Sequence, residues 1–126
     1  MRAVDTNVLV RLIVRDDARQ VAAAEAFLHQ GAWVSTLALV EAVWVLVAVY
    51  DRSAAEITGA IEMLLENTSL VLQDEHIVAG ALNLFRSSPS LGFSDCLMLE
   101  VARHAGHVPL GTFDRRLGRL EGAQKL

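Results

Sequence analysis

The chain has 126 residues, of which 53% are hydrophobic, so it is long enough to bury the core of one domain. Its formal net charge of −4 argues against a strongly basic nucleic-acid-binding surface, although bound divalent cations can reverse the field locally. A single cysteine, Cys96, excludes an internal disulfide, fits a reducing compartment and makes a cytoplasmic location the default expectation.

The apolar stretch at residues 32–50 raises the possibility of a membrane span. It has nearly the required length, but it contains Ser35, Thr36 and a central Glu41. A span needs about 20 mostly apolar residues, and a carboxylate in mid-membrane is costly. Asp5 also comes too early in the sequence for a secretory signal. We therefore expect a buried helix here and no membrane partner.

Short strands and helices alternate along the predicted chain. We expect strands at 2–4, 32–35, 70–72 and 108–112. We expect helices at 6–14, 16–29, 36–50, 53–66, 74–86 and 94–105. Ser53 followed by Glu56 predicts a capping box, and Asp74 predicts a helix cap. This alternation predicts a single α/β domain over residues 1–126, with a mostly parallel sheet covered by helices on both faces.

Four acidic residues lie far apart in the sequence, yet each occupies a position that could face one region of such a fold. Asp5 ends the first predicted strand, and Glu41 lies about two turns into the helix that follows the second. Asp95 opens a predicted helix, and Asp114 follows the last predicted strand. In parallel α/β sheets, functional groups gather beyond the carboxyl ends of the strands. We therefore expect that the four carboxylates could converge.

Converging carboxylates suit Mg²⁺ or Mn²⁺, which prefer carboxylate oxygens and water as ligands. One or two such ions can lower the pKa of a bound water, orient it toward a phosphodiester and neutralise charge on the leaving oxygen. Without an ion, clustered carboxylates repel one another. We expect hydrogen bonds from Thr6, Asn7, Ser35 and Thr112 to orient the acidic side chains.

Four short motifs carry a resemblance that covers nearly the whole chain. They are VDTNVL at 4–9, STLALVE at 35–41, GFSDCL at 92–97 and TFD at 112–114. In their order, their spacing and the total length, the chain resembles the PIN-domain ribonucleases, specifically the VapC toxins of bacterial and archaeal toxin–antitoxin pairs. Two departures are small: Gly111 stands where an apolar strand residue is commoner, and Cys96 where alanine is frequent.

The resemblance implies a PIN-like three-layer α/β sandwich, with a central mostly parallel sheet flanked by helices. It also implies a Mg²⁺- or Mn²⁺-dependent endoribonuclease, in which Asp5, Glu41 and Asp95 bind the metal at the catalytic centre. Asp114 would complete this catalytic metal cluster through water. Family members usually dimerise, and a cognate antitoxin, here a VapB-like partner, silences them.

Five arginines are candidate contacts for the phosphates of RNA. Arg115, Arg116 and Arg119 directly follow the fourth motif, which would place them beside the metal. Arg11 and Arg15 lie on the first predicted helix and are similar candidates. The alternative explanation for these charges is a solvated helix face.

Each acidic residue also has a structural explanation. Asp5, Asp95 and Asp114 could each serve as a helix cap. Glu41, in its apolar surroundings, could instead pair with an arginine.

Other functions fit the sequence less well. A phospho-acceptor receiver domain would need an acidic neighbour of Asp5, and a haloacid-dehalogenase-type phosphatase would need an acid in place of Asn7. A catalytically silent PIN-like protein-binding module would be marked by a lost acid, yet all four are present. A DNA-directed nuclease remains an alternative, because the metal chemistry does not distinguish the two sugars.

Overall fold

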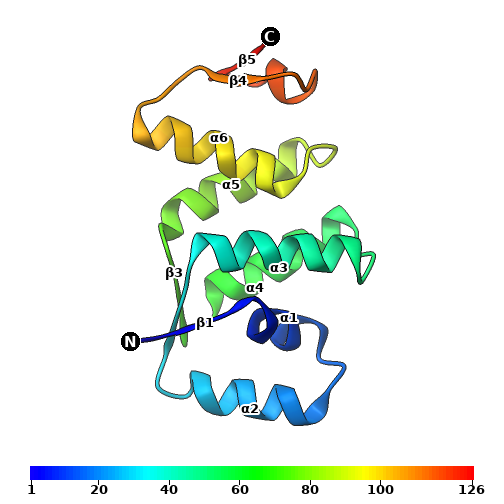
Figure 1. Cartoon of the computed structure of the whole chain (residues 1–126), viewed down its shortest axis with the longest axis vertical. Helices are drawn as coiled ribbons and strands as arrows, with labels where there is room; N and C mark the ends of the chain where they lie inside the picture. The colour runs from blue at the N-terminus through cyan, green and yellow to red at the C-terminus, as the bar shows by residue number, and fades with distance from the viewer. The chain divides into compact units, whose positions relative to one another are not determined.

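The structure, a computed structural model, describes all 126 residues and divides into two compact units (Figure 1). The first unit comprises Met1–Glu75 and the second comprises His76–Leu126. Each unit is described by itself below.

The first unit is a three-stranded parallel sheet with its connecting helices. Its elements in chain order are β1 (Arg2–Val4), α1 (Thr6–Val14), α2 (Ala18–Leu28), β2 (Ala32–Val34), α3 (Thr36–Ala48), α4 (Ala54–Glu66) and β3 (Leu70–Leu72). Strand β2 lies in the middle, and Val34 pairs in register with Val4 on one side and Leu72 on the other. All three strands therefore end at the same edge, where α1 and α3 begin.

Side-chain caps explain why several of these helices begin where they do. Asp17 accepts hydrogen bonds from the backbone N–H groups of Arg19 and Gln20 at the start of α2. The predicted capping box is present at the start of α4, where Ser53 and Glu56 each bond the other's backbone N–H. These bonds satisfy donors that have no partner inside the helix.

Helix α3 is the helix expected in place of a membrane span, but it is buried on one face only. The buried side chains lie at helical spacing: Ala38, Leu39, Ala42, Val43 and Leu46. On the other face Leu37 is 69% exposed and Trp44 is 67% exposed. The helix has 13 residues, and no helix of the protein is long and apolar enough to cross a bilayer.

The second unit packs two helices and a small two-stranded sheet. Its elements are α5 (Glu75–Ser87, of which Glu75 belongs to the first unit), α6 (Phe93–Ala105), β4 (Leu110–Thr112), the 3-10 turn η1 (Leu117–Arg119) and β5 (Ala123–Lys125). The Phe85 and Phe93 rings meet edge to face with centroids 6.0 Å apart. Gly106 ends α6 with a φ of 80°, a left-handed conformation that glycine adopts without a steric penalty.

The α/β class and the parallel strand pairing are confirmed, with three differences of detail. The five strands form two sheets rather than one, because β4 pairs with β5. Neither β5 nor η1 was predicted from the sequence. Asp74 is not a cap: it has a φ of 49° and makes no hydrogen bond to the start of α5.

Candidate metal and nucleic-acid site

Asp5 lies at the carboxyl end of β1 and caps α1. One carboxylate oxygen, Oδ1, accepts a hydrogen bond from the backbone N–H of Val8 at 3.2 Å. The side chain is exposed, and its second oxygen makes no bond within the protein. The capping explanation is therefore correct for Asp5, yet capping leaves half of the carboxylate available to a ligand.

Glu41 lies beside the start of α1. The hydroxyl of Thr6 donates to Oε2 of Glu41 at 2.8 Å, which joins the first sequence motif to the second. The salt bridge considered for Glu41 is absent. The expected burial of Glu41 was wrong, since its side chain is exposed. The helical period explains this, because residue 41 falls on the same face of α3 as the exposed Leu37 and Trp44.

The residues expected to orient the acids have different positions. Thr6 bonds Glu41, as described above. Thr112 accepts the backbone N–H of Asp114 at 3.0 Å. Ser35 instead caps α3 through the N–H of Ala38 at 3.0 Å. Asn7 lies in a groove between α1 and α2 and makes no hydrogen bond to Asp5 or Glu41.

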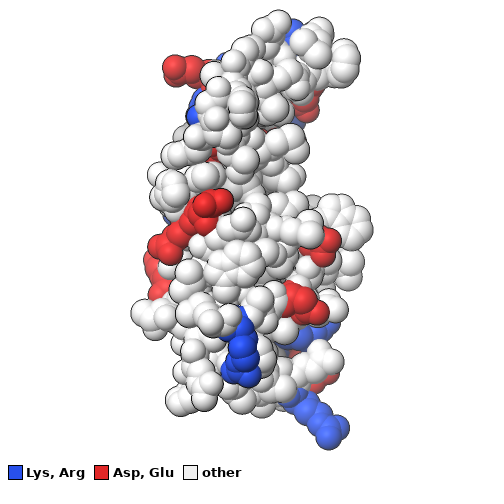
Figure 2. All heavy atoms as spheres, turned by 60° about the vertical axis from the view of Figure 1, so that its left-hand side comes forward, with Lys and Arg blue, Asp and Glu red and all other residues white.

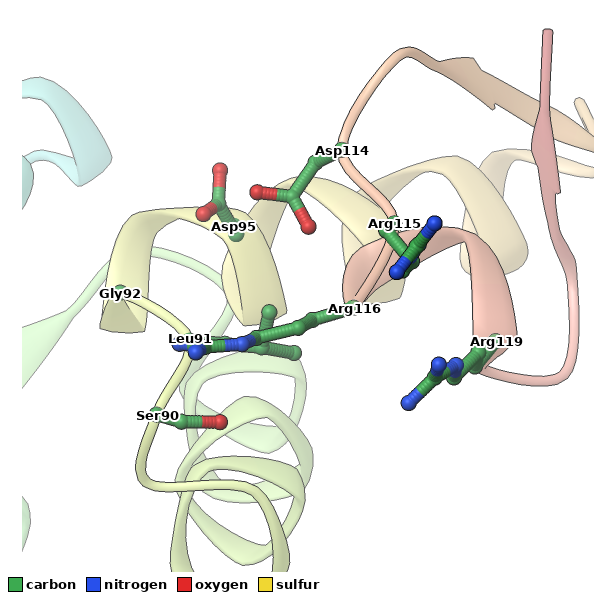
Figure 3. A pocket seen from close by; sticks show the side chains of 8 residues that line it. All are labelled: Ser90, Leu91, Gly92, Asp95, Asp114, Arg115, Arg116 and Arg119. Carbon is green, nitrogen blue, oxygen red and sulfur yellow. The ribbon is translucent and has the colours of Figure 1, made fainter.

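Asp95 and Asp114 line one open hollow of about 470 Å³ in the second unit (Figure 3). The carboxylate of Asp114 points toward Asp95, and Arg116 extends across the hollow toward Leu91. The complete lining is Ser90, Leu91, Gly92, Asp95, Asp114, Arg115, Arg116 and Arg119. Two carboxylates and three guanidinium groups thus share one small volume.

The backbone acts differently on the two carboxylates of this hollow. Asp95 stands in the first turn of α6, where the helix dipole favours negative charge. Asp114 accepts the N–H of Leu117 through Oδ1 at 2.8 Å, so it caps the η1 turn and keeps Oδ2 free. The cap explanation therefore holds for Asp114 as well, whereas Asp95 makes no cap bond at the start of α6.

The three arginines of the hollow differ from the two on α1. Arg115, Arg116 and Arg119 form no salt bridge with any carboxylate. Arg11 pairs with Asp16 and also bonds the Tyr50 hydroxyl, and the bond to Asp16 raises the pKa of the guanidinium. Arg15 pairs with Glu25 at 2.7 Å. Of the five candidate arginines, only Arg115, Arg116 and Arg119 therefore make no salt bridge.

Basic side chains do not gather on the face shown in Figure 2. There they are scattered among uncharged and acidic atoms and form no continuous basic surface, whereas several acidic groups adjoin one another at mid-height on the left. This agrees with the net charge of −4. Neither the net charge nor this face therefore indicates a broad basic field of the kind that attracts nucleic acid over a distance.

The four predicted acids are divided two and two between the units. Within each unit, no three acidic, histidine or cysteine side chains are close enough to hold a metal ion by themselves. The donors that are present, carboxylate oxygens open to solvent, have the chemistry that Mg²⁺ and Mn²⁺ prefer. The shared four-acid site remains a prediction.

Cys96 does not contribute a reactive group. Its side chain is fully buried in α6, and burial, together with the neighbouring Asp95 charge, raises the pKa of the thiol to about 11. Because the thiolate is the nucleophilic form, a raised pKa leaves the sulfur inert near neutral pH.

Comparison of the chain with models of known protein families identifies the family to which it belongs. The family model of the PIN domain matches residues 2–123, which include all four acids and both units. The chain belongs to the PIN domain family. PIN domains are generally metal-dependent nucleases that act on nucleic acid. No curated protein and no solved structure matches the chain.

Sequence reasoning missed part of the PIN domain's second-unit hollow. Ser90 and Leu91 line it, although neither belongs to a motif. Their position directly before the third motif was the available signal, since a loop that precedes a functional helix often reaches the same site.

Proposed function

We propose that this PIN domain is a metal-dependent endoribonuclease, the toxin of a VapBC-type toxin–antitoxin pair. The observation that carries the proposal is the hollow in which Asp95 and Asp114 stand beside three arginines without salt bridges. Carboxylates attract a divalent cation, and arginines attract phosphate oxygens. A phosphodiester accompanied by a metal ion satisfies both sets of groups.

Asp5, Glu41, Asp95 and Asp114 are the proposed metal ligands. A bound Mg²⁺ or Mn²⁺ would supply an activated water and would neutralise charge on the leaving oxygen. The chain's own groups do the positioning: the Thr6 hydroxyl holds Glu41, and the N–H of Leu117 holds Asp114. The arginines would bind oxygens of the phosphate that is cleaved.

The toxin role rests on the four motifs, which occur in the order and spacing of VapC proteins. Such a protein would form a homodimer and would be silenced by a VapB-like antitoxin. The retention of all four acids favours this enzyme over a catalytically silent protein-binding module.

The first test is cleavage of RNA by the purified protein with added Mg²⁺ or Mn²⁺. We expect products with 5′-phosphate and 3′-hydroxyl ends, because attack by water does not use the ribose hydroxyl. The Asp95→Asn variant should keep the fold and lose the activity. Cleavage of single-stranded DNA but not of RNA would show that the protein is a DNA-directed nuclease instead. Cleavage that persists in Asp95→Asn would refute the proposed role of Asp95 in the catalytic centre.

The toxin role needs a separate experiment in cells. We expect brief induction of the wild type to arrest growth and produce new 5′-phosphate RNA ends, neither of which occurs with Asp95→Asn. Co-expression of the cognate VapB-like antitoxin should restore growth. Normal growth with an active, antitoxin-free enzyme would refute the toxin role while leaving the nuclease intact.

A further inference from the structure

A second hollow of about 400 Å³ adjoins the first one in the second unit. The two hollows share Ser90, Leu91, Arg116 and Arg119. The second alone includes Ser87, Ser88, Pro89 and Leu120. Figure 3 shows the side chain of Arg116 reaching across the shared wall toward Leu91.

The two hollows differ in charge. The first contains two carboxylates, whereas no acidic residue lines the second. The second combines two arginines with serine hydroxyls, and the hydroxyls of Ser88 and Ser90 make no hydrogen bond within the protein. Guanidinium and hydroxyl donors together, with no carboxylate in the lining of the second hollow itself, form a setting that favours an anionic oxygen ligand.

Both walls of the second hollow are held in place by backbone bonds. The N–H of Ser88 donates to the carbonyl of Leu84 at 3.0 Å, and the N–H of Leu91 donates to the carbonyl of Ser88 at 3.0 Å. On the opposite wall, the buried Leu117 anchors the turn that carries Arg116 and Arg119. The donors are therefore presented from fixed backbone rather than from a free loop.

We propose that the second hollow binds a phosphate of the RNA strand next to the one that is cleaved. This inference rests on the proposed function, because it takes the Asp95–Asp114 hollow as the place of cleavage. Arg116 and Arg119 border both hollows, so they would bridge the two phosphates, while Ser88 and Ser90 would donate to the second. The strand would then leave the cleavage site along the loop at residues 87–91.

Binding of a short single-stranded RNA to an Asp95→Asn background tests this without cleavage. The plot of log affinity against log salt has a negative slope. We expect Arg119→Ala to reduce the magnitude of that slope by about 0.7, the value for one lost phosphate contact on a single strand. Lys125→Ala is the matched control, since Lys125 is basic and lies in the same unit but lines neither hollow. An unchanged slope in Arg119→Ala would overturn the proposal.

A substitution of Ser88 tests the second hollow independently of the first, because Ser88 lines only the second. We expect Ser88→Asp to weaken RNA binding at least tenfold by placing a negative charge beside the phosphate. Thr68→Asp, at an exposed turn outside both hollows, should leave binding unchanged apart from a small general repulsion. Equal effects of the two variants would refute a specific subsite. Melting temperatures of all variants verify folding.

A neutral methylphosphonate, introduced at one RNA position at a time, locates the contact. We expect a loss of affinity at one phosphate adjacent to the cleaved one, and we expect that loss to disappear in the Ser88→Asp variant. A loss that persists there would reject the assignment. Because these are binding measurements, a protein that shows this pattern but never cleaves RNA would refute the proposed function and still support the phosphate subsite.

Discussion

Asp5 and Asp114 each follow a strand, and each accepts a backbone N–H at the start of the next helical turn through one carboxylate oxygen. A cap needs only one acceptor, so the other oxygen remains free for a cation. The structural and the functional explanations of these residues are therefore compatible. Substitutions can separate them, because asparagine caps a helix almost as well as aspartate.

Asp5→Asn and Asp5→Ala should differ in stability but not in activity. We expect the alanine variant to lose about 1 kcal/mol of unfolding free energy with the cap, and the asparagine variant to lose much less. Both should lose RNA cleavage, since neither supplies a carboxylate. Urea denaturation and cleavage assays check the pair. Full activity in Asp5→Asn would exclude Asp5 as a ligand.

In the proposed metal site, Thr6 would act through Glu41 rather than directly. We expect Thr6→Val to weaken Mn²⁺ binding by roughly 10-fold or more, the usual effect of removing a group that orients a ligand. Thr6→Ser keeps the hydroxyl and should keep the affinity. Calorimetric titration of Mn²⁺ compares the two variants. Equal affinities would show that the 2.8 Å bond to Glu41 does not matter for the metal.

At the scale of elements, the sequence predicted best where local contacts decide the structure. The starts of α1, α3 and α4 follow from Asp5, Ser35 and Ser53, which bond within three residues along the chain. Strand β5 was missed because its residues, Ala123–Lys125, show no hydrophobic run, and only pairing with the distant β4 makes them a strand.

The candidate site was predictable to a similar degree. The four acids were proposed from their positions in the α/β pattern and from the motifs, and their shared role stays a prediction, whereas the second hollow depends on the turn at residues 116–119 facing the loop at 87–91. Such a contact between distant segments leaves no periodic signal in the sequence. The exposure of Glu41 was mispredicted because the apolar residues around it outnumber those that α3 buries.

The capping box at the start of α4 makes stability depend on pH. The backbone N–H of Ser53, and then Arg52 and the Ser53 side chain, lower the pKa of Glu56 from its ordinary 4.5. A lowered pKa means that the contribution is complete above about pH 4.5 and is lost as the pH falls below it. We expect the stability difference between wild type and Glu56→Ala to shrink over that range, as measured by urea denaturation at several pH values. A constant difference would contradict this.

At the scale of the whole molecule, the match to the PIN domain at residues 2–123 extends over both units. If all four acids bind metal, Mn²⁺ should stabilise the native state. A ligand present at about 100 times its dissociation constant adds about 2.7 kcal/mol. We expect Mn²⁺ to raise the melting temperature of the wild type, and Glu41→Gln and Asp95→Asn each to reduce that rise. Ca²⁺ at equal concentration is a control for general charge screening. An undiminished rise in either variant would remove that residue from the ligand set.

The in-register ends of β1 and β2 have a consequence for the protein before it meets any ion. Because both strands stop at one edge, α1 and α3 start there with their positive dipole ends beside Asp5. Because these dipoles offset carboxylate charge without help from a cation, we expect this unit to fold in the absence of metal. Under the proposed metal dependence, the supply of divalent ions would then control activity and not the folding of this unit.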